Sequence, residues 1–204
     1  EVFQNLIELN LNNHLNVLKP NFRRLPKLNK LNHLKLGTGY PHNEDESEPL
    51  SNIESSKNLE TISIDLSAFS HDTEMTVSIH LDLKNFHKLN KLKKLELGSI
   101  HLPLLKDIDK LENLESFELI NPHVVTEDSN EDFYPVDPPM TEEDLDFIKY
   151  MKNLNELKLY LPRFHLKTNN FNPKKLISLI NPKIKKLEIL CGFAKEKIIE
   201  ANTL

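Results

Sequence analysis

The sequence predicts an α/β fold, a solenoid of stacked repeats with a curved, mainly parallel β-sheet and short 3₁₀ or α turns on its convex side. The first observation is the stretch from Leu92 to Leu102, LKKLELGSIHL, whose apolar residues fall at positions one, four, six, nine and eleven. The second is that this frame recurs along the chain. The third is that 204 residues, 38% of them hydrophobic, can build one substantial core.

Within the frame, a pair of leucines defines a short strand. Leu95 and Leu97 point toward the core, because side chains two residues apart on a strand share a face. Leu92 enters the same core from the preceding turn, while Ile100 and Leu102 carry the chain back beneath the sheet. The other frames are Leu6-Leu9-Leu11, Leu31-Leu34-Leu36, Leu59-Ile62-Ile64, Leu114-Phe117-Leu119, Leu154-Leu157-Leu159 and Ile184-Leu187-Ile189. They predict parallel strands near residues 8–12, 33–37, 61–66, 94–98, 116–120, 156–160 and 186–190.

This pattern resembles that of leucine-rich-repeat proteins over nearly the whole chain. Successive frames are separated by 25, 28, 33, 22, 40 and 30 residues, which resembles the irregular members of that family. The position where the family usually has Asn or Cys is occupied by His14, Gly39, Ser67, Ile100, Pro122, Pro162 and Gly192. In the family, the Asn or Cys side chains at this position satisfy backbone groups at the turns. Because this chain lacks them there, we expect no asparagine ladder through the array.

The segments between the strands predict turns and loops. Leu25, Leu28 and Leu31 recur every third residue, which favours a short 3₁₀ or helical turn on the convex side. The loop GTGYPHNEDESEP follows the second strand, and two interpretations of it stay open. It is a surface insertion, or its carboxylates bind Ca²⁺, although their spacing matches no EF-hand loop. These carboxylates belong to Glu44, Asp45, Glu46 and Glu48.

Two longer stretches interrupt the repeats. Residues of about 66–86 contain the alternating segment MTVSIHLDL, which lies too close to the third frame for another repeat and predicts an antiparallel hairpin. Residues 126–146 hold nine acids and no Lys or Arg and form an acidic insertion, of which we expect residues 126–139 to be a mobile surface excursion. The insertion ends in a helix with Thr141 as N-cap, Asp144 at the third position, and Leu145, Ile148 and Met151 or Lys152 inward. The region of about 193–204 predicts a terminal helix that caps the last strand.

Composition limits the class of protein. The whole chain, residues 1–204, is expected to form a single domain, and no apolar run reaches the roughly 20 residues of a membrane helix. The frame already begins at Leu6, so we expect a piece of a longer protein from which a signal peptide could have been removed. One cysteine, Cys191, excludes an internal disulfide and favours the cytoplasm, while a secreted bacterial protein stays open. The net charge of −5 argues against a general nucleic-acid partner.

No catalytic or cofactor motif stands out. None of the nine histidines lies in HExxH, although His80, His87 and His101 could meet in space, and the lone cysteine has no local His partner. Neither GxxxxGK[ST] nor GxGxxG occurs. We therefore expect no enzyme activity, no cofactor, no metal site and no small-molecule substrate.

The candidate site consists of outward residues between the strand leucines, which form columns across a parallel sheet. The middle column is Asn10, Lys35, Ser63, Glu96, Glu118, Lys158 and Glu188. The next column is Asn12, Gly37, Asp65, Gly98, Ile120, Tyr160 and Leu190. Clustered apolar groups indicate a contact surface or a patch that the insertion covers. The charged column is a solvated ion-pair ladder or part of that surface. The candidate partner-binding residues are Glu118, Ile120, Lys158, Tyr160 and Leu190.

The resemblance implies a non-enzymatic scaffold that recognises a protein partner on its concave sheet face, as in a sensor or an effector. Two other classes stay open. One is a subunit that regulates a GTPase or recruits a ubiquitin-ligase substrate, for which the sequence has no dedicated motif. The other is a structural or adhesive surface protein, which a signal peptide in the full-length gene would favour.

Overall fold

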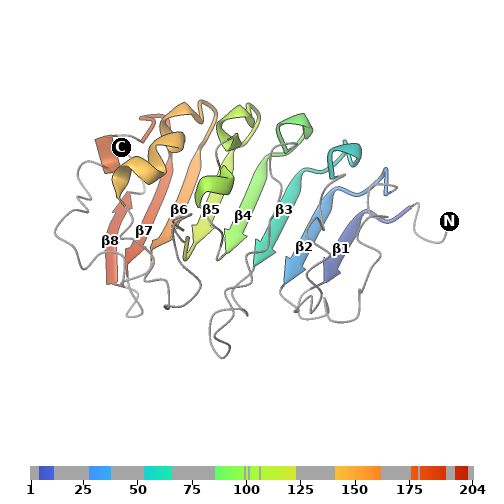
Figure 1. Cartoon of the computed structure of the whole chain (residues 1–204), viewed down its shortest axis with the longest axis horizontal. Coiled ribbons are helices and arrows are strands. Elements are labelled where there is room, and N and C mark those ends of the chain that lie inside the picture. Colours follow the sequence, from blue (N-terminus) through green and yellow to red (C-terminus); the bar gives the residue numbers. More distant parts are fainter. Residues whose placement is uncertain are drawn as a thin grey trace, which may run out of the picture.

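The computed structural model describes residues 5–11, 28–37, 53–65, 86–98, 100, 102–105, 107–122, 141–161, 176–178, 180–191 and 196–201. Their strands form one sheet in the order of the sequence, β1-β2-β3-β4-β5-β6-β7-β8 (Figure 1). The strands are β1 (Glu8–Leu11), β2 (His33–Gly37), β3 (Thr61–Asp65), β4 (Lys94–Gly98), β5 (Ser116–Ile120), β6 (Glu156–Leu161), β7 (Lys186–Cys191) and β8 (Glu196–Ala201). The first seven pair in parallel, each within one residue of its predicted bounds.

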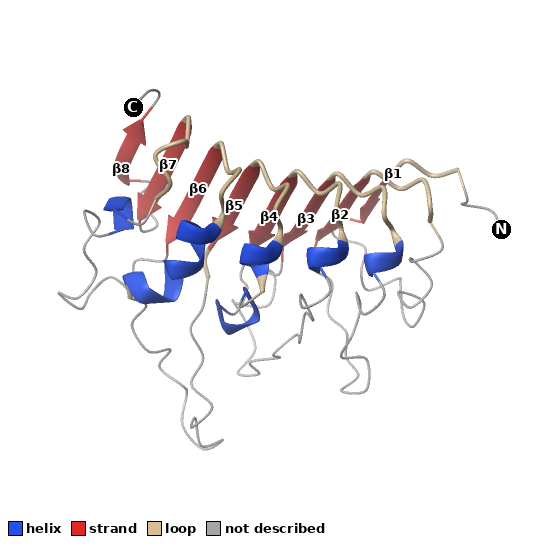
Figure 2. Ribbon diagram, turned by 90° about the horizontal axis from the view of Figure 1, so that it is seen from above, coloured by secondary structure: helices blue, strands red, loops and turns tan. Residues whose placement is uncertain are grey.

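Short 3₁₀ helices follow one face of the sheet, and the other face carries none of the described helices (Figure 2). They are η3 (Ile53–Ser55), η5 (Phe86–Lys88), η6 (Leu102–Leu105), η7 (Ile108–Lys110) and η8 (Glu142–Tyr150). We call the opposite face the concave face. This arrangement confirms the predicted leucine-rich-repeat solenoid, because each parallel strand returns to the next through a compact turn on one side.

The core lies between the sheet and these helices. From β2 to β7, all three residues of every frame are buried, and the frame positions lie opposite one another in register. Leu6, Leu9 and Leu11 of the first repeat are only partly buried, and Ile7 is 56% exposed. Among the described residues, the apolar side chains of the first repeat are therefore less completely covered than those of the inner repeats.

One carbonyl per repeat fixes the start of the next strand. The carbonyl of Glu60 accepts the N–H groups of Lys93 and Lys94, at 2.9 and 3.0 Å. The same double contact recurs at the carbonyls of Ile7, Asn32, Lys93, Glu115 and Asn155. Because a slip of one residue would turn the buried leucines outward, these contacts and the frame enforce the same register.

The structure confirms the helix predicted before β6, with Thr141 as its N-cap residue. The Asp144 carboxylate accepts a hydrogen bond from the backbone N–H of Thr141 at 2.7 Å and one from its hydroxyl at 3.0 Å. The N-cap residue of η8 therefore has a partner for its backbone N–H group. Leu145 and Ile148 are fully buried. Of the two alternatives for the next inward residue, Met151 is buried and Lys152 is exposed.

The predicted terminal helix is wrong. Residues Glu196–Ala201 form β8, which pairs antiparallel with β7. The physical reason is that β7 would otherwise present a row of unpaired backbone groups, which a strand satisfies and a helix does not. Ile198 and Ile199 are β-branched residues that also favour a strand.

Several predicted features lie outside the described residues. They are the loop with the four carboxylates, the hairpin within 66–85, the acidic insertion up to residue 140, and Asn12 of the second column.

Candidate functional site

The sheet register builds both predicted columns. In the middle column, Glu96, Glu118, Lys158 and Glu188 lie opposite one another on β4 to β7. In the next column, Gly98, Ile120, Tyr160 and Leu190 do the same. The alternating residues of these strands are buried toward the helices, so the columns belong to the concave face. All five candidate residues are thus brought together on β5, β6 and β7.

Ile120, Tyr160 and Leu190 form a row of half-buried side chains on the concave face, which we call the apolar row. Asn121, which follows β5, has φ 46° and donates its N–H to the Tyr160 carbonyl at 2.7 Å. Asparagine tolerates this left-handed conformation better than most residues. Burial, together with the charges of Glu118 and Glu188, raises the pKa of the Tyr160 hydroxyl. The phenol is therefore neutral near pH 7 and can donate a hydrogen bond.

A charged network borders the apolar row. The Lys158 ammonium lies 3.4 Å from the Glu118 carboxylate and 3.8 Å from that of Glu156. Burial opposes the charge on Lys158, but the two carboxylates outweigh it and raise its pKa. Glu156 also binds Lys186 at 2.5 Å and accepts the Ser116 hydroxyl at 3.2 Å. The Lys186 contact lowers the pKa of Glu156, against the smaller opposing effect of burial. The network holds alternating charges at defined positions beside Tyr160.

A second charged cluster lies on β4. The Lys94 ammonium is 2.6 Å from the Glu96 carboxylate. Burial would raise the pKa of Glu96, but hydrogen bonds from Lys94 and Ser63 outweigh it and leave the pKa lowered. Ser63 is itself a buried polar residue, with 8% of its surface exposed. Glu96 therefore satisfies a buried hydroxyl as well as an ammonium group.

Glu96→Gln is expected to flatten part of the acid dependence of stability. A carboxylate with a lowered folded pKa stabilises the fold above its unfolded pKa of about 4.3, and this contribution is lost as the pH falls through the folded value. The effect should be roughly 0.5–1 kcal/mol at pH 7 and should vanish at low pH, because the pair is partly exposed. Urea unfolding from pH 7 to pH 2.5 measures it. An equal loss at all pH values would show that the charge is not the cause.

Gly98 has a packing role that depends on its neighbour Asp65. A Cβ atom on Gly98 would lie 2.7 Å from Asp65 Oδ1 and 3.3 Å from the Asp65 Cα. The register sets these two residues opposite each other, so the aspartate occupies the space that a side chain at position 98 would need.

Gly98→Ala is expected to destabilise the protein by about 1–2 kcal/mol, because the new methyl group overpacks this contact. In an Asp65→Gly background the same change should cost less than about 0.5 kcal/mol, since the carboxylate is gone. Chemical denaturation of the four proteins measures the difference. A cost that stays the same in both backgrounds would place its origin in the backbone of β3.

A ladder of asparagine and lysine side chains ties the turns that precede the strands, which corrects the expectation that none runs through the array. The expectation concerned the position after each strand. Asn58, Asn113, Asn153 and Asn181 donate their side-chain amides to carbonyls of the preceding repeat, at 2.6, 2.7, 2.6 and 3.2 Å. Elsewhere Lys30 and Lys91 reach back to the side-chain oxygens of Asn5 and Asn58, each at 2.7 Å. The recurrence of Asn just before the first apolar residue of many frames was the available signal.

The described part of the chain holds no group of three or more His, Cys, Asp or Glu side chains arranged for a metal ion. Of the three histidines considered above, only His87 lies within it. No helix among the described residues is long and apolar enough to cross a membrane. The concave face offers hydrogen-bonding, charged and apolar contacts, which is chemistry suited to binding.

No protein-family model and no curated protein sequence matches the chain. Among solved structures, it is similar to a leucine-rich-repeat protein of Leptospira interrogans, with 19% identity over 93% of this chain and a TM-score of 0.43. It is also similar to an internalin, InlF, of Listeria monocytogenes, with 16% identity over 76% of this chain and a TM-score of 0.34. The chain spans 42% of the length of each of these two proteins.

Proposed function

We propose, from the leucine-rich-repeat fold of this chain, that it is a non-enzymatic recognition module that binds a protein partner on its concave face. The observation that carries the proposal is the juxtaposition of the apolar row with the charged network across β5, β6 and β7. Binding hot spots combine a large side chain that loses water with surrounding polar groups that orient the partner.

Tyr160 is the centre of this proposed surface. It lies between Ile120 and Leu190 in the register, and its own strand carries Lys158 two residues earlier. A tyrosine offers a rigid apolar ring and a polar tip at a low cost in side-chain entropy. The lysine and the carboxylates beside it would steer and orient a partner more than they would add affinity.

Tyr160→Ala should weaken partner binding by roughly 1–3 kcal/mol and leave the melting temperature nearly unchanged. The partner is first identified by placing a photo-crosslinking amino acid at position 188, which lies on the same face opposite Lys158 and leaves Tyr160 in place. Its dissociation constant is then measured by calorimetry for the parent protein, Tyr160→Ala and Leu190→Ala. Lys158→Ala should mainly lower the association rate and its dependence on salt.

Tyr150→Ala is the matched control. Tyr150 belongs to η8 on the helical side, is 53% exposed, and loses the same atoms on mutation. It should leave binding unchanged. If Tyr150→Ala abolishes binding and Tyr160→Ala does not, the helical side is the interface. If Tyr160→Ala lowers the melting temperature strongly, the tyrosine is structural and the proposed surface is wrong.

A further inference from the structure

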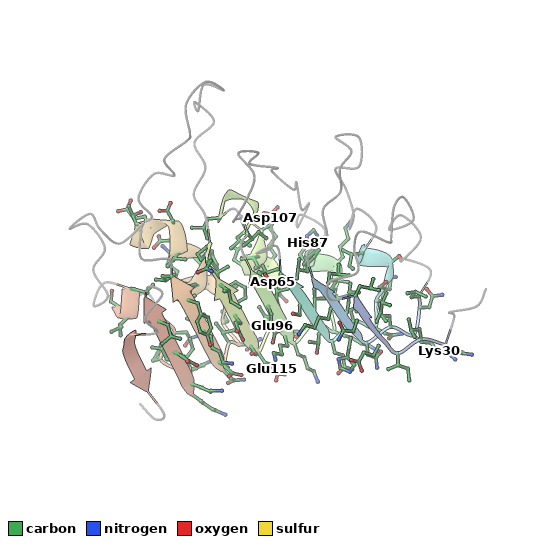
Figure 3. All side chains as sticks on the ribbon, turned by 90° about the horizontal axis from the view of Figure 1, so that it is seen from below. Lys30, Asp65, His87, Glu96, Asp107 and Glu115 are labelled. Carbon is green, nitrogen blue, oxygen red and sulfur yellow. The ribbon has the colours of Figure 1, made fainter. Side chains whose placement is uncertain are left out.

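A hollow with basic walls lies between the third and fourth repeats, at the edge where the turns lead into the strands. Its volume is about 630 Å³, and it is lined by Lys57, His87, Lys88, Asn90 and Lys91. Figure 3 shows His87 on the side of the short helices and Glu96 on the sheet. None of these lining residues belongs to the apolar row or the charged network, so the hollow is a separate feature.

Neighbouring repeats supply the three lysines. Lys57 lies in the turn that precedes β3, Lys88 ends η5, and Lys91 lies in the turn that precedes β4. Adjacent parallel strands are about 4.8 Å apart, so flexible lysines of neighbouring turns can reach one group. The Lys91 ammonium is held by the Asn58 side-chain oxygen at 2.7 Å, which leaves two of its three hydrogens for another acceptor.

The positive charges of the three lysines favour the binding of an anion in this hollow. Lys57 and Lys88 are exposed, and among the described residues neither forms an ion pair with a carboxylate. The three lysines line one space, so an anion bound there would be attracted by three positive charges. A dianion gains about twice the Coulomb energy of a monoanion at the same distances. Lysine ammonium groups bind phosphate as point charges, without the fixed geometry that arginine requires.

We propose that this hollow binds a phosphate monoester group, with Lys57, Lys88 and Lys91 as its cationic ligands. Asn90 and His87 complete the wall of the hollow. The phosphate group can belong to a phosphorylated sugar or to a phosphorylated peptide, because the lysines bind the dianion and not the molecule that carries it. Binding here is independent of the concave face.

The test is a titration of the ¹⁵N-labelled protein with glucose 6-phosphate, followed by NMR at constant ionic strength. We expect saturable shifts at the amides of Lys57, Lys88 and Lys91 and at the ring protons of His87. Lys57→Ala/Lys88→Ala should raise the dissociation constant by about fivefold or more, because two of three cationic ligands are lost. Both residues are exposed, so the variant should fold, which its spectrum away from the hollow checks.

Lys152→Ala/Lys183→Ala is the matched control, with the same change in net charge at exposed lysines of the turns before β6 and β7. It should change the dissociation constant by less than about twofold. Equal weakening in both double variants, or shifts that do not saturate, would overturn the proposal. Tyr160→Ala should leave this titration unaltered.

Two further ligands separate charge from carrier. Glucose 6-sulfate carries a single charge on the same sugar and should bind about threefold more weakly or worse. Equal affinity for the sulfate would overturn the assignment to a dianion. A phosphoserine peptide that binds more tightly than glucose 6-phosphate identifies a phosphorylated protein as the carrier, and the reverse order identifies a small phosphate ester. Either order supports the phosphate site.

Discussion

Leu97→Asp is expected to unfold the repeat array at neutral pH. Leu97 is fully buried, and its neighbours in the register are Ile64 and Leu119, which are also buried. Neither of these two neighbouring side chains can donate a hydrogen bond to a carboxylate. Burying an unpaired charge among them costs several kcal/mol, which is most of the stability of a typical domain. Far-UV circular dichroism at 25 °C should show loss of the sheet signal.

Two controls separate the causes of this effect. Lys93→Asp introduces the same carboxylate at an exposed position of the same repeat and should leave the melting temperature within a few degrees of the parent value. Leu97→Asn removes the same apolar surface without the charge, so it should destabilise less than Leu97→Asp. A Leu97→Asp protein that melts like the parent would contradict the burial of this position.

Phe117→Ala is expected to destabilise the protein by about 3–5 kcal/mol, because it deletes a fully buried ring and leaves a cavity. Phe117 lies on β5 and contacts the ring of Phe147 on η8 edge to face, with centroids 6.0 Å apart and planes at 81°. The contact joins the fifth repeat to the helix that leads into β6. Equilibrium unfolding in urea measures the loss.

A double-mutant cycle with Phe147→Ala tests this contact. The coupling energy between the two rings should be about 0.5–1.5 kcal/mol. In a repeat array, stability is a sum of repeat terms and interface terms, so hydrogen exchange should rise most on β5 and β6. Strictly additive effects of the two mutations would show that the rings contribute only through their own burial.

The sequence was informative wherever burial decided the structure. A buried strand of a repeat must place its apolar residues in one frame, so the bounds of seven strands and the neighbours of Tyr160 followed from the positions of the leucines. The candidate residues could be grouped for the same reason, because a parallel register carries equivalent positions to the same column. The chemistry of the partner leaves no comparable periodic signal in a single chain.

Features that depend on backbone hydrogen bonds were harder to predict. The segment of β8 contains two adjacent isoleucines between charged residues, a pattern too short to distinguish a helix from a strand. The segment forms a strand because it pairs with the open edge of β7. That edge exists only in the folded sheet, so the local sequence pattern does not reveal it. The ladder in the turns was missed because the expectation applied a family position, although Asn58 and Asn113 have the same place in their own frames.

The ladder also separates deletions of whole repeats that keep its contacts from deletions that break them. Asn58 forms hydrogen bonds with both neighbouring repeats. Its side-chain amide donates to the Asn29 carbonyl, and its side-chain oxygen accepts from the Lys91 ammonium. Recombination that deleted only the third repeat would set Lys91 against Lys30, two ammonium groups where an acceptor is needed. Deleting the third and fourth repeats together would bring Asn113 to the Asn29 carbonyl and keep the contact chemically intact. In the N-terminal half, a pair of repeats is therefore the shortest deletion that keeps this contact.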